Sequence, residues 1–263
     1  MRISFDRVAK IYDKTRGLPI QVMRQLIEEL IHEVSDRKTI LDVGVGTGRF
    51  SKPLKDIGLN VVGIDIAEKM IRKAIKIGVD KLVLGDALFL PFRDSCFDAA
   101  ISIHLLHLIR EWKEALQEIC RVTKGTMLSM DYRFKNPIRV AYNQLLESHG
   151  YEPRRIGKGE WELKYLIKPS KSLLVASFDI DANETLDYLA QRVYSSQWEI
   201  PEEINDKIVI ELKKRFTDKL IPQELHILVW NMEDLKTFCS DSLRWARWVA
   251  RFDEDRSQKK IIY

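Results

Sequence analysis

Apolar and polar positions in the first half of the chain alternate between two periods. Short apolar runs predict strands, and they lie at residues 39–43, 60–64, 81–84, 97–103 and 126–130. Stretches with apolar residues on one helix face predict amphipathic helices, and they lie at 18–35, 48–57, 67–77 and 110–122. Short apolar strands that alternate with helices are typical of right-handed βαβ units. The pattern therefore predicts a parallel sheet with helices on both faces.

The pattern changes after residue 131. A helix is predicted over 136–149, whereas 150–171 is charged and has no clear period. Two strand-like runs, 172–178 and 224–230, enclose about forty residues with two helical patterns that begin at Asn183 and Pro201. A final helix is predicted over 232–250. The second half is thus expected to add helices and a last pair of strands to the first.

Composition narrows the possible classes of protein. The 43 basic and 39 acidic residues are mixed along the chain and leave a net charge of +4, which is typical of a solvated surface rather than a nucleic-acid-binding tail. No apolar run begins the chain or reaches membrane-spanning length. Cys96, Cys120 and Cys239 lack the spacing of a metal site or of a disulfide framework. We therefore expect a cytoplasmic protein with reduced thiols, no membrane anchor, no bound metal and no DNA partner.

A glycine-rich segment, TILDVGVGTGRF (39–50), follows the first predicted strand and opens the next helix. Gly44, Gly46 and Gly48 let the backbone bend sharply and let a ligand approach the free amide groups of the helix start. The dinucleotide fingerprint G-x-G-x-x-G would need glycine where this chain has Arg49. A phosphate-binding P-loop is excluded because no Gly-Lys-Ser/Thr follows.

Acidic residues end the next two strands. Asp65 closes the second strand, where a carboxylate can accept both hydroxyl donors of a ribose. Asp86 follows the third strand and could accept from an exocyclic purine amine, while Ala87 leaves room for the ring. Each acid taken alone could equally be a helix cap or a loop residue. Together with Asp42 before the glycine turn, they favour a nucleoside site.

Four segments carry a resemblance to a known family: FDRVAKIYDKTRGLP, LDVGVGTGRF, VVGIDIAEKM and LVLGDALFLPFRDSCFDAAISIHLLHLI. Over about residues 5–131 the chain resembles the class I, Rossmann-like methyltransferases that depend on S-adenosylmethionine (SAM), specifically the small-molecule and quinone-type enzymes. The resemblance implies SAM as cofactor. It implies a cofactor site made of Tyr12, Arg16, Asp42, Gly44, Val45, Gly46, Gly48, Asp65, Ile66, Met70, Asp86, Ala87 and His104.

The resemblance also assigns roles within this site. Asp42 and the glycine turn would meet the methionine part of SAM, Asp65 the ribose, and Asp86 with Ala87 the adenine. Tyr12 and Arg16 resemble a YD-x-x-R segment that closes over the cofactor, with the arginine facing its carboxylate. Ile64, Ile66, Met70 and Leu88 would supply apolar walls for the adenosine, and His104 would lie beside the methionine part.

The family fold agrees with the second half of the chain, because its sheet ends in an antiparallel strand pair. We therefore expect an α/β fold: a doubly wound, mostly parallel sheet with a terminal antiparallel strand pair, helices on both faces, and a helical insertion before the last strand. The expected organisation is one methyltransferase domain over 1–263. Within it, 36–131 would form the SAM-binding half, 132–231 the acceptor-side region with the insertion, and 232–263 a C-terminal helix and tail.

Methyl transfer from a sulfonium is an in-line displacement that depends mainly on alignment, so a general base is optional. His104 and His107 follow the fourth strand and could deprotonate a hydroxyl acceptor. The alternative, which we favour from sequence, is that His104 packs against the cofactor and His107 caps a helix or lies in the core. The Asn/Asp-Pro-Pro-Tyr/Phe motif of base and glutamine N-methyltransferases does not occur here, which argues against methylation of base amines.

Several questions stay open at this point. An NAD-type oxidoreductase is the main competing enzyme class, and a non-catalytic SAM-fold binding subunit is the main alternative to an enzyme. The second alternative depends on the basic last helix, where Trp245 and Trp248 lie among arginines that could equally snorkel outward from a docked helix. Aromatic residues over 194–198 could line an acceptor pocket or form the core of the insertion. The acceptor, expected to be a small molecule, and the oligomeric state are not determined.

Overall fold

One mixed sheet organises the molecule. The computed structural model describes residues 5–7, 9–15, 17–152 and 159–241. Its strands are β1 (Thr39–Val43), β2 (Asn60–Asp65), β3 (Leu82–Leu84), β4 (Phe97–Ile101), β5 (Thr123–Tyr132), β6 (Lys171–Asp181) and β7 (Leu220–Asn231). They lie in the order β3-β2-β1-β4-β5-β7-β6, with β1 to β5 parallel and β7 antiparallel to both β5 and β6.

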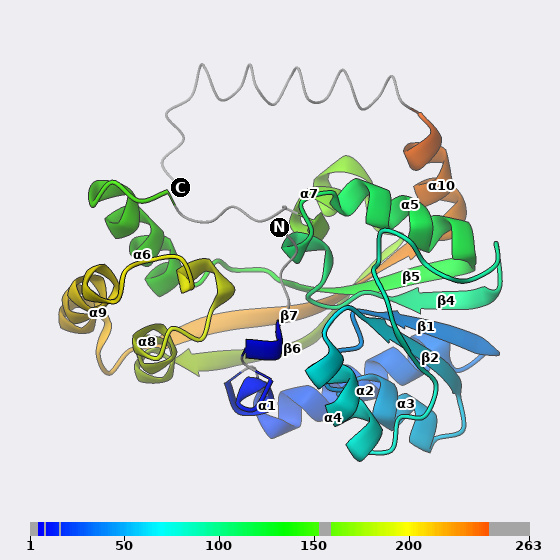
Figure 1. Cartoon of the computed structure of the whole chain (residues 1–263), viewed down its shortest axis with the longest axis horizontal. Helices are drawn as coiled ribbons and strands as arrows, with labels where there is room; N and C mark the ends of the chain where they lie inside the picture. Colours follow the sequence, from blue (N-terminus) through cyan, green and yellow to red (C-terminus); the bar gives the residue numbers. More distant parts are fainter. Residues whose placement is uncertain (1–4, 8, 16, 153–158, 242–263) are drawn as a thin grey trace.

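Helices cover both faces of this sheet (Figure 1). One face carries α2 (Ile20–Val34), α3 (Ser51–Asp56) and α4 (Glu68–Lys76), and the other carries α5 (Trp112–Val122), α7 (Gly159–Leu166) and α10 (Met232–Ser240). Amphipathic spacing explains the docking. In α2, for example, Val22, Leu26, Leu30 and Val34 recur every four residues and are all buried. The short elements are η1 (Phe5–Arg7), α1 (Tyr12–Thr15), η2 (Leu106–Leu108) and η3 (Ser195–Gln197).

The strand order creates a crevice at one edge. β1 lies between β2 and β4, so the chain leaves β1 toward β2 and β3 and later returns to β4 on the opposite side. In open α/β sheets a ligand binds outside the carboxyl ends of the strands at such a switch point. The residues that follow β1, β2, β3 and β4 therefore converge on one crevice.

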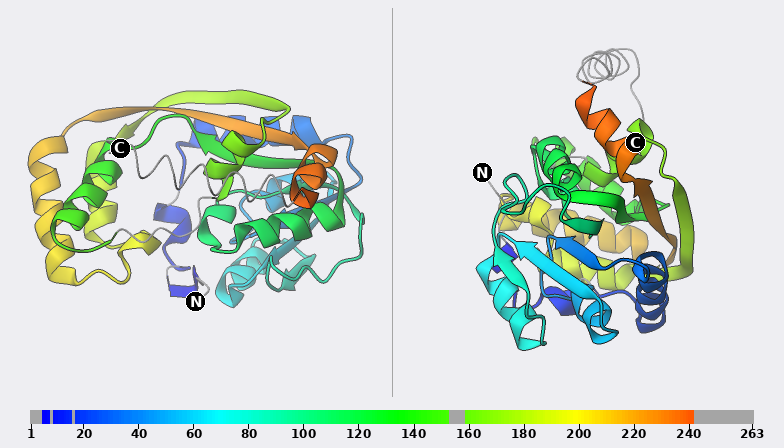
Figure 2. Two further views of the ribbon diagram at one scale, coloured as in Figure 1. Left: turned by 90° about the horizontal axis from the view of Figure 1, so that it is seen from above. Right: turned by 90° about the vertical axis from the view of Figure 1, so that its right-hand side faces the viewer.

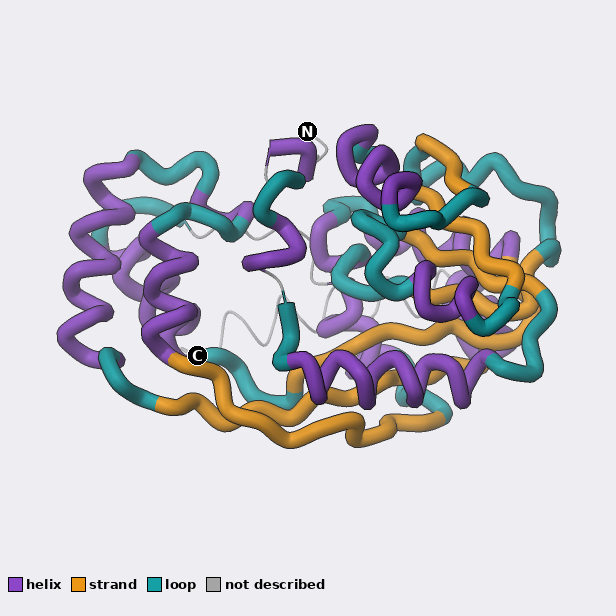
Figure 3. Tube along the Cα trace, turned by 90° about the horizontal axis from the view of Figure 1, so that it is seen from below, coloured by secondary structure: helices purple, strands orange, loops and turns teal. Residues whose placement is uncertain are grey.

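The antiparallel strands extend beyond the parallel sheet and carry a second group of helices, here called the helical lobe. It consists of α6 (Pro137–Ser148), α8 (Ala182–Ala190) and α9 (Glu202–Phe216), which share a core of their own. Only the second part of β7 pairs with β5, while its first residues pair with β6 alone. In Figures 2 and 3 this lobe lies beside the main body, joined to it by the long strands.

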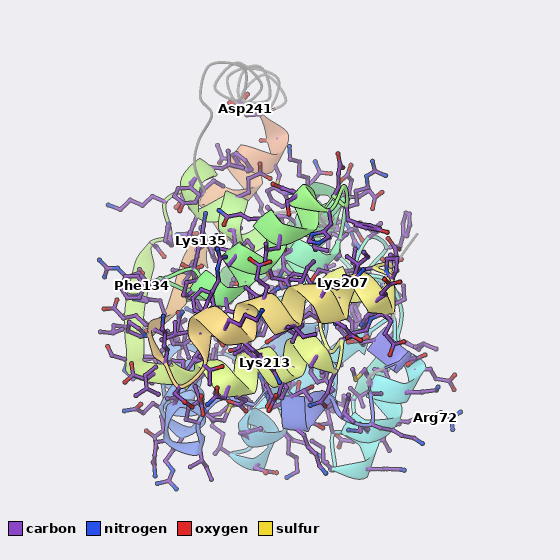
Figure 4. All side chains as sticks on the ribbon, turned by 90° about the vertical axis from the view of Figure 1, so that its left-hand side faces the viewer. Arg72, Phe134, Lys135, Lys207, Lys213 and Asp241 are labelled. Atoms are coloured by element: carbon purple, nitrogen blue, oxygen red, sulfur yellow. The ribbon has the colours of Figure 1, made fainter. Side chains whose placement is uncertain are left out.

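Polar side chains of the helical lobe make contacts both in its core and on its outer surface. Asn205 is fully buried, and its Oδ1 accepts hydrogen bonds from Tyr142 Oη and Gln197 Nε2, both at 2.7 Å. On the outer side, Lys207 pairs with Glu203 along α9 and is labelled in Figure 4. A satisfied polar network inside a small core favours one arrangement of the helices over others.

The predicted fold class is confirmed, including the terminal antiparallel pair and the helical insertion, α8 and α9, before β7. Several strands are longer than the sequence predicted. The strands expected at 126–130, 172–178 and 224–230 are all longer, because strand pairing continues past the apolar core into partly polar positions. The helix expected over 48–57 begins only at Ser51, since the residues before it form the turn.

One helix was missed, and part of another predicted helix lies outside the described residues. The segment 150–171 contains α7, which lacks an apolar stripe because Gly159 and Glu160 are buried beside Leu163. The helix predicted over 232–250 is seen as α10, Met232–Ser240, while residues 242–263, with Trp245 and Trp248, lie outside the described part of the chain.

Two sequence expectations concern thiols and membranes. The three cysteines are free, with Cys120 Sγ and Cys239 Sγ 4.0 Å apart between α5 and α10. Among the described residues, none of the helices combines the length and the apolar character needed to cross a bilayer.

Candidate functional site

The glycine turn after β1 depends on backbone conformations that favour glycine. Gly44, Gly46 and Gly48 have φ values of +77°, +55° and +82°. A Cβ added to Gly44 would lie 2.8 Å from Leu105 Cδ1, and one on Gly48 would lie 2.9 Å from Val79 Cγ2. A Cβ on Gly46 would have its nearest neighbour at 3.9 Å, the oxygen of Gly44. The outer glycines are therefore required for packing, whereas the middle one presents its backbone to open space.

Asp65 joins the end of β2 to this turn. Its Oδ2 accepts a hydrogen bond of 2.8 Å from Gly46 N, and its Oδ1 accepts one of 2.8 Å from Ala67 N. The amides of Gly44 and Val45 donate to the carbonyl oxygen of Ile64, which ties the turn to the same strand. Burial raises the pKa of Asp65 and outweighs these backbone donors, which lower it. The Asp65 carboxylate thus lies beside the glycine turn, as the sequence predicted.

Asp42 lies beneath the turn. Its side chain is buried, and its Oδ2 accepts a hydrogen bond of 2.6 Å from Ser51 Oγ at the start of α3. Burial, with a smaller contribution from the charge of Asp65, raises the pKa of Asp42 to about 7, although the Ser51 hydrogen bond opposes this rise. Asp42 therefore supports the turn from below and contributes little exposed surface to the crevice.

The adenine-side residues lie at the adjacent strand end. Gly85 N donates to the carbonyl oxygen of Asp65, which brings the loop after β3 beside the end of β2. Asp86 is half-buried, and its Oδ1 accepts a hydrogen bond from Leu88 N at 2.9 Å. Ala87 is half-buried against the core next to it. The two acids that were predicted to flank a nucleoside thus occupy neighbouring strand ends.

Two of the apolar residues predicted as walls, Ile66 and Met70, lie in different surroundings. Ile66 is 41% exposed, directly after Asp65. Met70 is buried in a small cluster with Ala9 and Ala67, under the N-terminal segment. Ile66 is available to a ligand in the crevice. Met70 instead packs beneath the residues that would touch this ligand.

The N-terminal segment is fastened to the glycine turn by a residue that the sequence analysis did not single out. Asp13 Oδ1 accepts a hydrogen bond of 2.6 Å from Thr47 Oγ1, and its Oδ2 pairs with Lys73 Nζ at 3.1 Å. Tyr12 packs edge-on against Phe5, with ring centroids 5.9 Å apart. Arg16, predicted to face the cofactor carboxylate, lies outside the described residues. The YD-x-x-R resemblance contains Asp13 and was the signal that could have identified it.

The segment after β4 is strained and faces the turn. His104 has φ of +58°, an unusual conformation for a residue other than glycine and one that is typical of functional sites. Its ring stacks on Tyr132 at 6.2 Å and meets the His107 ring edge-on at 6.1 Å. Leu105 packs against Gly44. His104 therefore lies beside a residue that packs on the glycine turn, and His107 meets the ring of His104.

Glu160, which the sequence analysis also missed, lies next to His107. It is 2% exposed, and its Oε2 lies 3.1 Å from His107 Nδ1. Burial raises the pKa of Glu160, but the charge and hydrogen bond of His107 and the backbone donors outweigh this effect and bring the pKa to about 2. Nothing in the local sequence indicates this role, because the contact joins residues 53 positions apart.

The sequence is similar to those of known methyltransferases. Residues 41–126 match the family model described as a methyltransferase domain. A demethylmenaquinone methyltransferase of Renibacterium salmoninarum is 34% identical over 152 residues, which cover 54% of this chain and 63% of that protein. One of Thermotoga maritima is 35% identical over 127 residues, covering 46% of this chain and 55% of that protein. The chain thus spans less than two thirds of the length of these relatives.

Solved structures agree in fold. A methyltransferase of Bacillus halodurans is 18% identical with a TM-score of 0.55, covering 78% of this chain and 98% of its own. A SAM-dependent methyltransferase of Thermotoga maritima is 18% identical with a TM-score of 0.51, covering 87% of this chain and 98% of its own. The predicted resemblance to the class I SAM-dependent methyltransferases is therefore confirmed in sequence and in fold.

Proposed function

We propose that this chain transfers a methyl group from SAM to a small-molecule acceptor by in-line displacement. The observation that carries the proposal is the contact of Asp65 with Gly46, which joins a bare backbone turn and a carboxylate at the switch point of the sheet. The open space beside Gly46 supports it further, because a ligand there would meet peptide groups and no side chain. SAM supplies a methyl group bound to a sulfonium. When the methyl group is transferred, the sulfur is left in a neutral thioether.

The proposed roles of the site residues are those that the resemblance implies, and their places at the edge support them. Gly44, Val45, Gly46 and Gly48 would hold the methionine part above Asp42, and Asp65 would accept both ribose hydroxyls, exchanging its bond to Gly46 for them. Asp86, Ala87 and Ile66 would border the adenosine. Tyr12, Met70 and Arg16 would belong to the cover formed by the N-terminal segment and α4. His104 would lie beside the methionine part.

The acceptor side is proposed to lie between the end of β4 and the region 132–231. Relatives named demethylmenaquinone methyltransferases support a small-molecule acceptor. The proposal treats 1–263 as one domain, with 36–131 binding SAM and 232–263 as a C-terminal helix and tail. It also keeps the cytoplasmic location that the sequence analysis expects.

A binding experiment tests the proposal against the oxidoreductase alternative. Equilibrium dialysis of the full chain with labelled SAM, NAD and NADP should give saturable binding of SAM alone. Asp65→Ala should weaken SAM binding at least about 100-fold, equivalent to roughly 2.7 kcal/mol, because it removes a paired carboxylate acceptor. Asp80→Ala is the matched control, since Asp80 is exposed and pairs only with Lys55 in the described structure.

Two results would contradict the proposal. Saturable SAM binding that Asp65→Ala leaves unchanged would show that the site lies elsewhere. Preferential binding of NAD or NADP would favour the oxidoreductase. Formation of S-adenosylhomocysteine when the chain is incubated with SAM and a small-molecule extract would in turn dispose of a non-catalytic binding subunit.

A further inference from the structure

Helix α7 lies over the carboxyl ends of β4 and β5 and is fastened there by two charged residues one turn apart. Glu160 binds the segment after β4, and Lys164 Nζ lies 2.6 Å from Asp131 Oδ2 near the end of β5. At Gly159 the backbones come so close that an added Cβ would collide with His107 N. The placement of α7 is therefore specified by charge and by close backbone approach.

The carboxylate of Glu160 is fully used by this segment. Oε1 accepts from the amides of Leu105 at 3.1 Å and Leu106 at 2.9 Å, and Oε2 accepts from the amide of His107 at 2.9 Å. Oε2 also lies 3.1 Å from His107 Nδ1. Because an ionised carboxylate can only accept, Nδ1 must carry the hydrogen in this contact. In the neutral imidazole Nε2 is then left with its lone pair.

The surroundings of His107 suit a group that exchanges a proton with a ligand. Trp161 stacks on its ring, with centroids 5.8 Å apart and an interplanar angle of 4°. His104 meets it edge-on, and Leu105, two positions earlier, packs against Gly44. The His107 side chain is 26% exposed, so it is neither sealed in the core nor freely solvated. Among the residues that the structure describes, the titratable groups seen in contact with it are Glu160 and His104.

We infer that His107 is a catalytic residue whose Nε2 takes the proton of an acceptor hydroxyl, with Glu160 as the positioning residue that holds Nδ1. The inference rests on the proposed function. As the acceptor O–H proton moves to Nε2, an oxygen lone pair forms the new O–CH₃ bond. The C–S bond breaks, and its electron pair stays on sulfur as the neutral thioether. One positive charge passes from the sulfonium to the imidazolium, where the Glu160 carboxylate stabilises it.

A purely structural role for the Glu160–His107 pair would make different predictions. As a cap of η2 (Leu106–Leu108), Glu160 would matter for folding, but the state of His107 Nε2 would not affect turnover. The pH dependence of the rate therefore separates the two roles, whereas the tautomer tests a condition that the catalytic role requires.

The first experiment observes the tautomer directly. Long-range ¹H–¹⁵N correlation spectra of the full chain with ¹⁵N-labelled histidine should show His107 protonated at Nδ1 and bare at Nε2 at high pH. His149→Gln, which removes an exposed histidine at the end of α6, gives a spectrum that aids assignment without touching the site. A His107 ring protonated at Nε2 alone would overturn the inference.

The second experiment measures turnover with labelled SAM and a small-molecule extract as the source of acceptor. For the wild type, the logarithm of the rate should rise with slope one at low pH and then level off. His107→Gln should lower the plateau rate at least about 100-fold and abolish the rise, within the range typical of general-base catalysis. Glu160→Gln should also lower the plateau rate, because the imidazolium loses its carboxylate partner.

The controls separate this inference from the proposed function. The dissociation constant for S-adenosylhomocysteine should stay within about twofold for both variants, and His149→Gln should turn over like the wild type. If SAM binds and product forms, but His107→Gln keeps the wild-type rate and pH profile, only the present inference fails. If the wild type forms no S-adenosylhomocysteine from any acceptor, the proposed function fails and this inference fails with it.

Discussion

The proposed cofactor edge and the proposed acceptor edge of the crevice are built in different ways. At the cofactor edge, the glycine turn and Asp65 are about twenty positions apart and are joined through adjacent parallel strands. At the acceptor edge, His107 depends on Glu160, and Asp131 depends on Lys164, across 53 and 33 positions. One edge is thus fixed by the register of neighbouring strands, whereas the other depends on a helix that docks from a distant part of the chain.

Under the proposed function, this difference separates the residues that bind SAM from the residues that select the acceptor. The turn geometry is dictated by backbone conformations, so any chain with this strand order and these glycines presents a similar surface to a nucleoside. The acceptor edge consists of side chains on α7 and in the segment after β4, which can change without disturbing the parallel sheet. Loops and added helices on a rigid scaffold are where specificity usually resides.

The largest effect is expected when the acceptor edge loses its buried anion. Glu160→Ala removes the acceptor of three backbone amides and of His107 Nδ1, and it should lower the free energy of unfolding by about 3–5 kcal/mol. Because the folded-state pKa of Glu160 is lowered to about 2, its contribution is present above pH 4.5 and is lost as pH falls from 4.5 toward 2. Urea unfolding at pH 7 and at pH 3 measures both effects.

Glu162→Ala serves as the matched control two positions away on the same helix. Glu162 is only half-buried, so its loss should change stability by no more than about 0.5 kcal/mol. Equal effects of the two substitutions would mean that α7 is not held by the Glu160 anion, and the contrast between the edges would disappear.

The next effect concerns the cofactor edge and its pH dependence. Burial raises the folded-state pKa of Asp42 from 3.8 to about 7, so the folded chain binds a proton there that the unfolded chain has lost. This group therefore stabilises the fold at low pH, and its contribution is lost as pH rises from about 4 to about 7. Asp42→Asn keeps an acceptor for Ser51 and removes the titration.

Thermal or urea unfolding of the two proteins across this pH range provides the measurement. In the absence of SAM, Asp42→Asn should gain roughly 3–4 kcal/mol on the wild type between pH 4 and pH 8, from about three pKa units at 1.36 kcal/mol each. A difference between the two proteins that does not vary with pH would show that Asp42 is not a buried titrating acid.

The smallest effect is expected in the helical lobe. Tyr142→Phe removes one hydrogen bond to Asn205 Oδ1, which still accepts from Gln197, so the cost should be about 1 kcal/mol. Tyr165→Phe on the exposed face of α7 is the control and should be nearly neutral. Hydrogen exchange of α6, α8 and α9 should report the loss inside the lobe while the parallel sheet keeps its protection. Equal loosening of the sheet would mean that the two regions unfold as one unit.

Local patterns account for most of the fold. The run 39–43 was predicted with the bounds that the structure gives β1, because a buried parallel strand has a continuous apolar signature. The helix α7 was not predicted, since its buried positions are Gly159, Glu160 and Leu163 and leave no apolar stripe to detect. The end of β5 was placed too early for a related reason, because Asp131 is a charged residue buried by its pairing with Lys164.

The site divides in the same way. Gly44, Gly46 and Gly48 were identified from their spacing, and Asp65 from its place at a strand end, because both depend on short-range geometry. Asp13 and Glu160 were not identified, and each acts through a partner at least 34 positions away. The assignment of the site residues to SAM stays a prediction for the binding experiment.

The sequence by itself determined the parallel sheet, the glycine turn and the acids beside it, because strand periodicity and glycine conformation are properties of a few consecutive residues. Only the tertiary structure decided that Glu160 meets His107, that Asp13 meets Thr47, and that three helices on extended strands form a lobe with its own core. Such contacts depend on how packed elements lie in space, and no spacing along the chain encodes the partner of a single charged side chain.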